Sequence, residues 1–451
     1  MGMRSVVKKV IPTKLFRDIE PYGHLLEAMT EETLAGFPAK GLKVIGVTGT
    51  DGKTSTCTLI TQMLRNAGYK VAMMTTISID YGDGVEHDNP TRLTSLGSAQ
   101  LIKKLKQIRA AGPEWLVLET TSHALAQHRV WGVPYSIGVM TNVGHEHLDY
   151  HRTFERYRDA KKMLFKHVNA NKRGLRVGIA NADDPSGELF AAAVKNPVLY
   201  GVKKGDLRAE NIKLTPSGSK YTAVIGEEKY QITCHLPGSF NVYNSLACVA
   251  VGRAIGLTKE QIEQGIASLQ SVEGRMTRVD EGQDFDVIVD YAHTPESFEK
   301  VIKEVRPLVT GRIITVFGSA GRRDTEKRAT QGEVAGRLGD IVIPTEEDDR
   351  DIDGQEILEQ IASGAEKAGK VKGKDLFLVH DREKAIEAAV KMAKKGDMIL
   401  LLGKGHEKSI LSNGPKAAEY RSRPQDDSDP ERVVKRDYDE VKAAKEALKN
   451  K

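Results

Sequence analysis

The chain has 451 residues, about three times the length of an average domain, so two or three domains with separate cores are expected. Apolar residues make up 39% and charged residues 29%, as in ordinary globular proteins, and no run approaches the roughly 18 apolar residues that a membrane span requires. The net charge of +5 is small, and basic residues are interleaved with acidic ones, so nucleic acid is not expected as a partner.

Residues 1–40 carry scattered charge and lack the long apolar core and small-residue cleavage site of a secretory signal. A cytoplasmic protein is therefore expected. The apolar side chains of this segment are expected to pack on the following domain, with an interfacial membrane helix as the alternative. They are Leu15, Phe16, Leu25, Leu26, Met29 and Leu34.

A strand, a glycine-rich turn and a helix are predicted in that order over residues 42–67. A β-branched run at 42–49 ends in glycine, and apolar residues at 54–67 recur with helical spacing. Further strands are predicted at residues 70–76, 115–119 and 136–141, and further helices at 97–111 and 154–168. This alternation predicts a mostly parallel α/β sheet.

The alternation becomes more regular after a predicted domain boundary at residues 271–275. Strands are predicted at residues 285–289, 313–317, 340–343, 376–379 and 398–402, with helices between them. The fold class is therefore α/β, with a mostly parallel sheet in the central domain, which begins with the glycine-rich turn (P-loop), and a Rossmann-like C-terminal domain. The predicted parts are a short N-terminal segment (1–40), a central domain (41–271), which the motifs below assign to ATP binding, and a C-terminal domain (272–451).

The glycine-rich loop Gly46-Val-Thr-Gly-Thr-Asp-Gly-Lys-Thr54 joins the first strand to its helix. Backbone N–H groups of such a loop can surround phosphate oxygens, Lys53 can reach the β- and γ-phosphates, and the Thr54 hydroxyl can bind Mg²⁺. Val47 breaks the strict P-loop spacing, so the alternative is a glycine turn with an unrelated lysine. The strand, loop and helix context favours phosphate binding. The candidate residues are Gly49, Thr50, Asp51, Gly52, Lys53, Thr54 and Ser55.

Two later segments place acidic and histidine residues just after predicted strands. They are Leu118-Glu-Thr-Thr-Ser-His123 and Thr141-Asn-Val-Gly-His-Glu-His-Leu-Asp-Tyr-His151. A carboxylate and an imidazole at the same sheet edge could hold a divalent ion beside nucleotide phosphates. The alternative is a solvated or hydrogen-bonded histidine cluster without an ion.

The helix predicted at 154–168 contains Tyr157-Arg-Asp-Ala-Lys-Lys-Met-Leu-Phe165. Helical spacing predicts that Tyr157, Ala160, Leu164 and Phe165 face a core. By its pattern alone, Lys161 is an ordinary lysine of the helix surface.

Several motifs, in this order, resemble the Mur ligase family, and within it the MurE-type enzymes. They are Gly-Thr-x-Gly-Lys-Thr, Glu-x-x-Ser-His, Asn-x-x-x-Glu-His-Leu-Asp-Tyr-His, Tyr-x-x-Ala-Lys-x-x-Leu-Phe, Asp-Tyr-Ala-His-Thr-Pro and Gly-Lys-Gly-His-Glu. The resemblance runs from Val44 to Glu407, most of the chain. It implies an ADP-forming ligase that uses ATP and Mg²⁺, acts on small-molecule substrates and is a monomer.

The resemblance also implies roles for individual residues. Lys53 and Thr54 would bind the ATP phosphates and a first Mg²⁺, and Glu119 and His147 would bind a second. Lys161 matches a carbamylated lysine, whose carbamate anion could orient a magnesium ion. Asn241 and Asn244 match the stretch that contacts the adenine, and Arg275, Asp290 and His293 match residues that close onto the nucleotide. The residues that the resemblance implies to be catalytic are Lys53, Glu119, His147, Lys161 and His293.

For the substrates, Thr94 and Ser95 resemble paired hydroxyls that hold a muramoyl peptide. Ser122 and Arg129 lie where the resemblance implies similar contacts. Arg350 matches a residue that binds the carboxylate of the incoming amino acid. Gly403 and Glu407 match positions that hold the far end of diaminopimelate.

The chain departs from the MurE pattern in two places. Glu347-Asp-Asp-Arg350 stands where diaminopimelate-adding enzymes have Asp-Asn-Pro-Arg, and the added acids Asp348 and Asp349 would suit a cationic amino acid such as lysine. Some 40 residues precede the first predicted strand, whereas MurE enzymes usually carry a uridine-diphosphate-binding domain there.

The implied reaction adds meso-diaminopimelate or L-lysine to the D-glutamate of UDP-N-acetylmuramoyl-L-alanyl-D-glutamate through an acyl phosphate, in peptidoglycan precursor synthesis. One alternative is a ligase of the same superfamily with a pseudomurein-type or folyl-polyglutamate-type acceptor. Another is a non-catalytic nucleotide-binding homologue.

Overall fold

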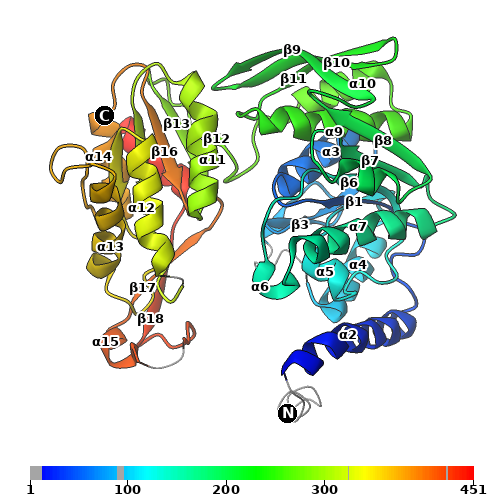
Figure 1. Cartoon of the computed structure of the whole chain (residues 1–451), viewed down its shortest axis with the longest axis horizontal. Coiled ribbons are helices and arrows are strands. Elements are labelled where there is room, and N and C mark those ends of the chain that lie inside the picture. Colours follow the sequence, from blue (N-terminus) through cyan, green and yellow to red (C-terminus); the bar gives the residue numbers. More distant parts are fainter. Residues whose placement is uncertain (1–12, 89–95, 324, 423–424) are drawn as a thin grey trace. The chain divides into compact units, whose positions relative to one another are not determined.

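The computed structural model describes residues 13–88, 96–323, 325–422 and 425–451, which divide into two compact units (Figure 1). The first unit contains most of the chain up to Gln270. The second contains Ser271–Lys451 together with the short segments Leu214–Gly218 and His235–Ser239. In the described part of the chain, no helix is long and apolar enough to cross a membrane.

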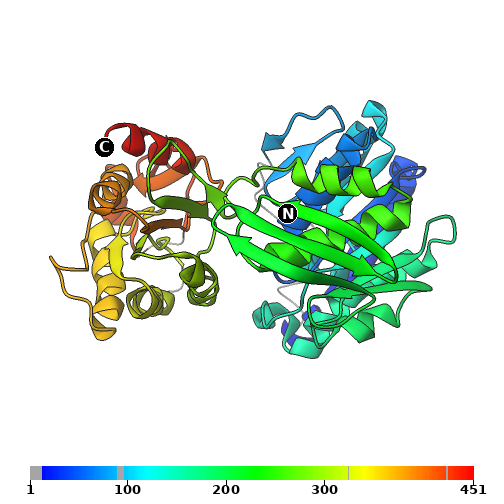
Figure 2. The same ribbon diagram turned by 90° about the horizontal axis from the view of Figure 1, so that it is seen from above.

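A single large sheet forms the centre of the first unit. Its strand order is β11-β10-β9-β8-β7-β6-β1-β5-β2-β3-β4. The strands are β1 (Lys43–Thr48), β2 (Val71–Met74), β3 (Ser78–Asp80), β4 (His87–Asp88), β5 (Trp115–Glu119), β6 (Tyr135–Met140), β7 (Val177–Asn181), β8 (Asn196–Gly201), β9 (Leu207–Thr215), β10 (Gly218–Ile225) and β11 (Glu228–Cys234). Strands β9 to β11 lie side by side in Figure 2.

The middle of this sheet is parallel, with β1 between β5 and β6. In register, Val47 lies beside Glu119 and Thr48 lies beside Met140. The carboxyl ends of these three strands therefore reach the same edge of the sheet, where ligands of parallel α/β proteins bind. The glycine-rich loop, Glu119 and the segment after Met140 all leave the sheet there.

The helices of the first unit are α2 (Thr13–Ala35), α3 (Lys53–Asn66), α4 (Ser98–Ala111), α5 (Ser122–Ala126), α6 (Leu148–His151), α7 (Phe154–Ala170), α8 (Gly187–Ala191), α9 (Phe240–Ile255) and α10 (Lys259–Ala267). Apolar side chains of α4, α5 and α7 form one buried cluster with strand residues such as Val44 and Leu116. Helices α3, α9 and α10 pack against one another. Tyr157, Leu164 and Phe165 of α7 are fully buried, as their helical spacing predicts.

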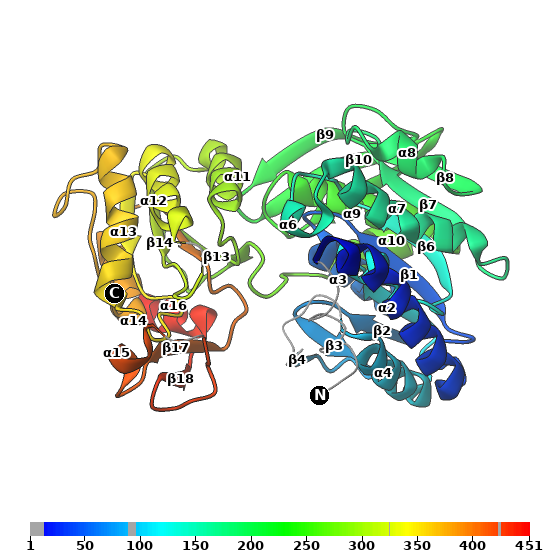
Figure 3. The same cartoon turned by 60° about the horizontal axis from the view of Figure 1, so that its bottom comes forward.

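Helix α2 lies beside α4 (Figure 3). Its buried described side chains are Ala28 and Glu32, whereas Leu26 and Leu34 are 67% and 84% exposed. The prediction that these two leucines pack on the central domain is therefore wrong.

The second unit has a five-stranded sheet among its described residues, in the order β12-β13-β16-β14-β15, and a separate hairpin of β17 and β18. The strands are β12 (Thr277–Arg278), β13 (Asp286–Asp290), β14 (Ile313–Phe317), β15 (Ile341–Pro344), β16 (Met398–Leu402), β17 (Ser409–Asn413) and β18 (Val433–Asp437). Strands β13, β16, β14 and β15 run parallel. This confirms the α/β fold class.

The helices of the second unit are α11 (Pro295–Val305), the 3₁₀ turn η1 (Arg306–Leu308), α12 (Glu326–Leu338), α13 (Gly354–Lys367), α14 (Arg382–Met392), α15 (Ala417–Tyr420) and α16 (Glu440–Lys449). Helix α12 packs between α11 and α13, and α14 packs on α16. Apolar residues of α14 and α16 join those of the sheet in one buried cluster.

The strand predicted at residues 376–379 does not form as a regular strand. The segment runs along β15, where the N–H of Phe377 donates to the carbonyl of Val342 at 3.0 Å and that of Val379 to Pro344 at 3.1 Å. The apolar pattern correctly placed this segment against the sheet. The prediction of regular pairing is wrong because the segment lies at the sheet edge and bonds to β15 in only a few places.

Candidate active site

The glycine-rich loop turns directly into α3 at Gly52, whose φ of +78° is a left-handed conformation that favours glycine. A Cβ at this position would lie 2.5 Å from Oδ1 of Asn244. Asn244 lies in α9, is buried, and donates to Oδ1 of Asn241 at 2.8 Å. The two asparagines predicted as nucleotide contacts therefore form a pair that packs against the back of the loop.

The segment after β6 holds the other side of the loop. The N–H groups of Thr50 and Asp51 donate to the carbonyl and the side-chain oxygen of Asn142, both at 2.9 Å. The hydroxyl of Thr141 donates to the carbonyl of Asp51 at 2.6 Å, and the N–H of Gly144 donates to the Thr50 hydroxyl at 2.8 Å. Sequence reasoning assigned no role to Thr141 or Asn142. Their place directly after a strand was the available signal.

The first residues of α3 meet the end of β5. The Thr54 hydroxyl donates to Oε2 of Glu119 at 2.9 Å, and the Glu119 side chain is only 4% exposed. Thr76 donates to the same carboxylate from its N–H at 3.1 Å and from its hydroxyl at 3.0 Å. The ammonium group of Lys53 donates to the carbonyl of Thr50 at 2.6 Å. Thus a cation, a hydroxyl and a carboxylate converge at the N-terminus of α3.

Lys161 is buried, with 2% of the residue exposed, so the residue-only prediction of a surface lysine is wrong. Its amine donates to the carbonyl of Gly49 at 2.6 Å and lies 4.5 Å from the ring centre of Tyr157. Burial, and secondarily the charge of Lys53, lowers the pKa of Lys161 well below its usual value. Helical spacing could not predict that Lys161 lies next to the glycine-rich loop, or that its ammonium form is destabilised there, because both depend on residues distant in sequence.

A cluster of histidine and tyrosine rings lies beside the loop. The rings of His123 and His147 are 4.8 Å apart, and those of His123 and His151 are 5.3 Å apart. A ring nitrogen of His151 lies 3.1 Å from the hydroxyl of Ser122, both buried. The Tyr157 hydroxyl, 3.1 Å from that of Thr50, joins this cluster to the glycine-rich loop.

His147 has a left-handed backbone, with φ of +55°, and its side chain is 45% exposed. Arg129 follows α5, is partly buried, and its backbone N–H donates to the carbonyl of Ala124 at 2.9 Å. Thr94 and Ser95, also predicted to hold the muramoyl peptide, lie outside the residues that the structure describes.

The oxygen atoms of Thr54 and Glu119 fit a magnesium ion, because Mg²⁺ prefers hard oxygen ligands. The Glu119 carboxylate accepts three hydrogen bonds from uncharged donors, namely the Thr54 hydroxyl and the N–H and hydroxyl of Thr76. It makes no ion pair with the described residues. His147 would supply an imidazole nitrogen, a ligand more typical of transition metals.

In the second unit, the three residues predicted to contact the nucleotide gather where β13 ends. Asp290 is buried and accepts N–H bonds from Met276 and Ala292, both at 2.8 Å. Burial raises the pKa of its carboxyl group, although the charge of Arg275 acts in the opposite direction. The Arg275 guanidinium lies 5.0 Å from the ring centre of Tyr291, and Nδ1 of His293 lies 3.0 Å from the Tyr291 carbonyl oxygen.

A buried run of charged residues, 346–351, follows β15. Arg350, predicted to bind an amino-acid carboxylate, donates to the carbonyl of Gly321 at 2.9 Å and to the carboxylate of Asp427 at 3.1 Å. Its guanidinium also lies 3.6 Å from the carboxylate of Asp348. In this structure its charge is therefore already paired within the protein.

Gly403 and Glu407 lie in the same region. The ammonium group of Lys404, fully buried, donates to Asp348 at 3.1 Å and to Glu407 at 2.6 Å. A Cβ at Gly403 would lie 2.7 Å from Oε2 of Glu347. That oxygen is buried and accepts no hydrogen bond from the residues described.

Asp348 and Asp349, the two acids that would suit a cationic amino acid, both have partners within the protein. Asp348 is engaged by Lys404, and Asp349 lies 2.6 Å from Nε2 of His380. Proximity to Asp349 raises the pKa of His380. Glu347 differs from both, because its Oε2 lies next to Gly403 and accepts no hydrogen bond from the described residues.

Comparison with known proteins gives matches along most of the chain. Residues 47–252 match the family described as the Mur ligase middle domain, and residues 274–405 match the Mur ligase, glutamate ligase domain. A UDP-N-acetylmuramyl-tripeptide synthetase from Roseiflexus sp. (strain RS-1) is 40% identical over 388 residues, which is 83% of this chain and 76% of the relative.

Two further matches carry similar names. A UDP-N-acetylmuramoyl-L-alanyl-D-glutamate–2,6-diaminopimelate ligase from Clostridium acetobutylicum is 38% identical over 374 residues, 82% of this chain and 74% of the relative. A solved structure of a UDP-N-acetylmuramoyl-L-alanyl-D-glutamate–2,6-diaminopimelate ligase has a TM-score of 0.65 at 27% identity, covering 91% of this chain and 79% of its own.

Proposed function

The chain belongs to the Mur ligase family, and we propose that it is an ATP-dependent ligase of peptidoglycan precursor synthesis. It adds a diamino acid, meso-diaminopimelate or L-lysine, to the D-glutamate carboxylate of UDP-N-acetylmuramoyl-L-alanyl-D-glutamate. The observation that carries the proposal is the buried contact of Thr54 with Glu119 at the start of α3. It supports the proposal because two oxygen atoms that could bind Mg²⁺ lie together at the helix start that follows the glycine-rich loop.

ATP binding is assigned to the loop of residues 49–55. The first N–H groups of α3 have no partner within their own helix, and together with the helix dipole they favour an anion. Lys53 stands at this helix start, and its ammonium group bonds to the Thr50 carbonyl. On nucleotide binding, Lys53 exchanges that carbonyl for a phosphate oxygen, which is a stronger, charge-assisted acceptor.

Magnesium ions would be held by Thr54, Glu119, His147 and a carbamylated Lys161. Such ions neutralise charge on the triphosphate and on the attacking carboxylate, which otherwise repel each other. Lys161 supports this assignment because its buried amine favours the neutral form, which is the form that reacts with CO₂. The carbamate would add a second anion beside Glu119 and suit the site for two cations.

The reaction proceeds in two transfers. The D-glutamate carboxylate attacks the γ-phosphorus, forming an acyl phosphate and releasing ADP, and the amine then attacks the acyl carbon and releases phosphate. The chain contributes mainly by positioning and by charge neutralisation, as is general for phosphoryl transfer. Ser122 and Arg129, with Thr94 and Ser95, are assigned to the muramoyl peptide.

The incoming amino acid is assigned to the second unit. Arg350 would bind the carboxylate of the amino acid in place of the carboxylate of Asp427. The Asp427 side chain is partly exposed, so it can turn toward solvent when it is replaced. Gly403 and Glu407 would hold the far end of the molecule. Glu347 adds a buried carboxylate oxygen next to Gly403 that could accept a hydrogen bond from an ammonium group.

The proposal is tested by ADP and phosphate release from ATP and Mg²⁺ with UDP-N-acetylmuramoyl-L-alanyl-D-glutamate, across diaminopimelate, lysine, ornithine and the other amino acids. The Lys53→Ala variant is the control for contaminating ATPases. Release that requires both the muramoyl dipeptide and one amino acid supports the proposal and names that amino acid.

Absence of release with every amino acid, despite measurable ATP binding, would reject this acceptor. A folyl-polyglutamate or pseudomurein-type acceptor would then be assayed in the same way. Release with none of these acceptors would leave a nucleotide-binding homologue without turnover, although such a protein has no need of the buried Glu119 and Lys161.

A further inference from the structure

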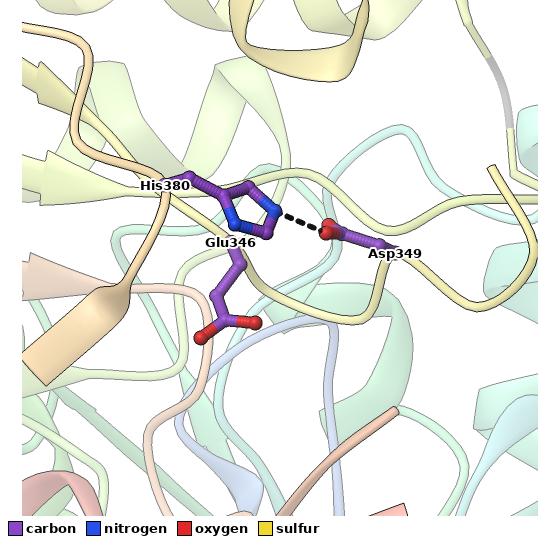
Figure 4. Close-up of side chains that lie close together, drawn as sticks. All are labelled: Glu346, Asp349 and His380. Carbon is purple, nitrogen blue, oxygen red and sulfur yellow. Dashed lines mark hydrogen bonds and ion pairs between the residues drawn. The ribbon is translucent and has the colours of Figure 1, made fainter. Parts of the chain in front are cut away.

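A second group of potential ligands lies in the second unit. Glu346 and Asp349 lie on the segment that follows β15, and His380 immediately precedes Asp381, the N-cap residue of α14 (Figure 4). One ligand atom from each of the three side chains lies within 4.8 Å of the other two. Glu346 is 5% exposed and Asp349 is 2% exposed, whereas the His380 side chain is half-exposed. The group therefore combines two buried carboxylates with an imidazole that solvent can reach.

Each of the two carboxylates has an oxygen atom without a hydrogen bond from the described residues. Oδ1 of Asp349 is buried and accepts none, while Oδ2 lies 2.6 Å from Nε2 of His380. The bonds to Glu346 come from the backbone of Arg382 at 3.4 Å and from the Arg436 guanidinium, and both go to Oε1. Oε2 therefore accepts no bond in the described part of the chain.

A buried carboxylate oxygen without a donor is unfavourable, and native proteins usually satisfy such atoms with a partner, a water or an ion. Gly354, the first residue of α13, lies close to the side chains of both Asp349 and His380. A Cβ at Gly354 would lie 2.4 Å from Oδ2 of Asp349 and 2.0 Å from Nε2 of His380. The Asp349 carboxylate therefore lies against Gly354 and His380 through Oδ2, and Oδ1 has no donor among the described residues.

We propose that Glu346, Asp349 and His380 bind a divalent transition-metal ion, of which Zn²⁺ is the representative. One imidazole and two carboxylates form a ligand set that suits zinc and its neighbours, whereas Mg²⁺ prefers oxygen ligands alone. The half-exposed side of His380 leaves room for water as a fourth ligand. All three residues belong to the second unit, and none of them is among the residues predicted to bind ATP or Mg²⁺.

The ion would connect two parts of the second unit. Asp349 immediately precedes Arg350, and His380 belongs to the segment between α13 and α14. Ligand atoms around a zinc ion lie roughly 3.4 Å apart when the bonds are about 2.1 Å long. Nε2 of His380 and Oδ2 of Asp349, now 2.6 Å apart, would therefore separate by about 1 Å, and the Glu346 carboxylate would move closer to them. The bound ion would hold the segment that presents Arg350 in one conformation.

The test uses full-length protein stripped of metals with a chelator and then dialysed against Zn²⁺, with excess Mg²⁺ added to compete for the site proposed in the first unit. Bound zinc is counted by elemental analysis, and affinity is measured by calorimetry. We expect one zinc ion per chain, with the dissociation constant raised at least about tenfold in His380→Gln and in Asp349→Asn. The matched controls His147→Gln and Glu119→Gln should keep this affinity.

Equal zinc affinity in the wild type and His380→Gln would overturn the proposal, and so would loss of zinc only in His147→Gln. No zinc binding above background would show that Asp349 and His380 form an ion pair only. His380 is half-exposed, so His380→Gln should remain folded even if Asp349→Asn does not, and its thermal unfolding verifies this. X-ray absorption of the zinc-loaded protein gives a second readout, and a spectrum without an imidazole ligand would also reject the site.

Discussion

The hydroxyl of Thr54 donates a hydrogen bond to the carboxylate of Glu119 at 2.9 Å, although 65 residues separate them in the chain. The contact exists because β1 and β5 are parallel neighbours, so that the loop after β1 and the last residue of β5 reach the same sheet edge. Burial of both side chains makes the pair sensitive to small changes in charge and shape.

The charge of Glu119 is the first property to test. Glu119→Gln keeps the size of the side chain but removes the anion that would bind Mg²⁺. We expect turnover to fall by about 100-fold or more, the usual effect of removing one electrostatic stabiliser. Thr76→Val removes one hydrogen bond to Glu119 and leaves the charge, so its turnover should fall by about tenfold or less. Equal losses in steady-state ADP release would show that the charge is not what matters.

The close approach of Gly52 to Asn244 predicts a specific effect of a methyl group. In Gly52→Ala the Cβ would meet Oδ1 of Asn244 at 2.5 Å, so ATP affinity should fall at least tenfold, as expected for about 1.4 kcal/mol or more. Gly68→Ala is the matched control, because Gly68 also has positive φ but a Cβ there would have no atom within 4 Å. Similar ATP affinities of the two variants, measured by calorimetry, would contradict the packing argument.

Carbamylation of Lys161 can be detected directly. Burial lowers the pKa of this amine, so at neutral pH its reactive neutral form is more populated than that of a surface lysine. Protein equilibrated with ¹³C-bicarbonate should show a carbamate carbon signal by NMR, absent in Lys161→Arg. The neighbouring Lys162, paired with Asp159 at 3.0 Å, supplies the control variant Lys162→Ala, which should keep the signal. A signal that survives in Lys161→Arg would place the modification elsewhere.

Arg350 and Asp427 should affect amino-acid binding in opposite directions. Arg350→Lys loses the planar fork that suits a carboxylate, so KM for the amino acid should rise at least about tenfold with little change in KM for ATP. Asp427→Asn removes the anion that now pairs with Arg350, so KM for the amino acid should fall. A rise in both variants would mean that the Arg350–Asp427 pair serves only to shape the site.

The C-terminal helix depends on a buried ion pair. Arg382 donates to both carboxylate oxygens of Glu440, at 2.8 and 2.7 Å, and both side chains are fully buried. Glu440→Ala leaves the guanidinium without its partner and should lower the free energy of unfolding by about 3–5 kcal/mol. Glu446→Ala removes only an exposed pair with Lys442, and should change it by less than about 1 kcal/mol. Denaturant unfolding measures both variants.

Strand positions were predictable where the apolar run was short and bounded by turn residues. β5, β14 and β16 have the bounds predicted from their sequence, because each is a fully buried strand of a parallel sheet. Residues 376–379 have a similar pattern but lie at the sheet edge, where pairing is incomplete. Periodicity reports burial, and burial does not distinguish a paired strand from an extended edge segment.

The sequence by itself determined the fold class, the glycine-rich loop before α3 and the family, because these depend on local spacing and on the order of motifs. Tertiary structure decided the environment of each charge. Lys161 has the helical position of a surface lysine but lies under Gly49, and Asp348 and Asp349 are already paired with Lys404 and His380. A side chain's partners come from distant parts of the chain, and its protonation and availability follow from those partners and from burial, which local sequence does not encode.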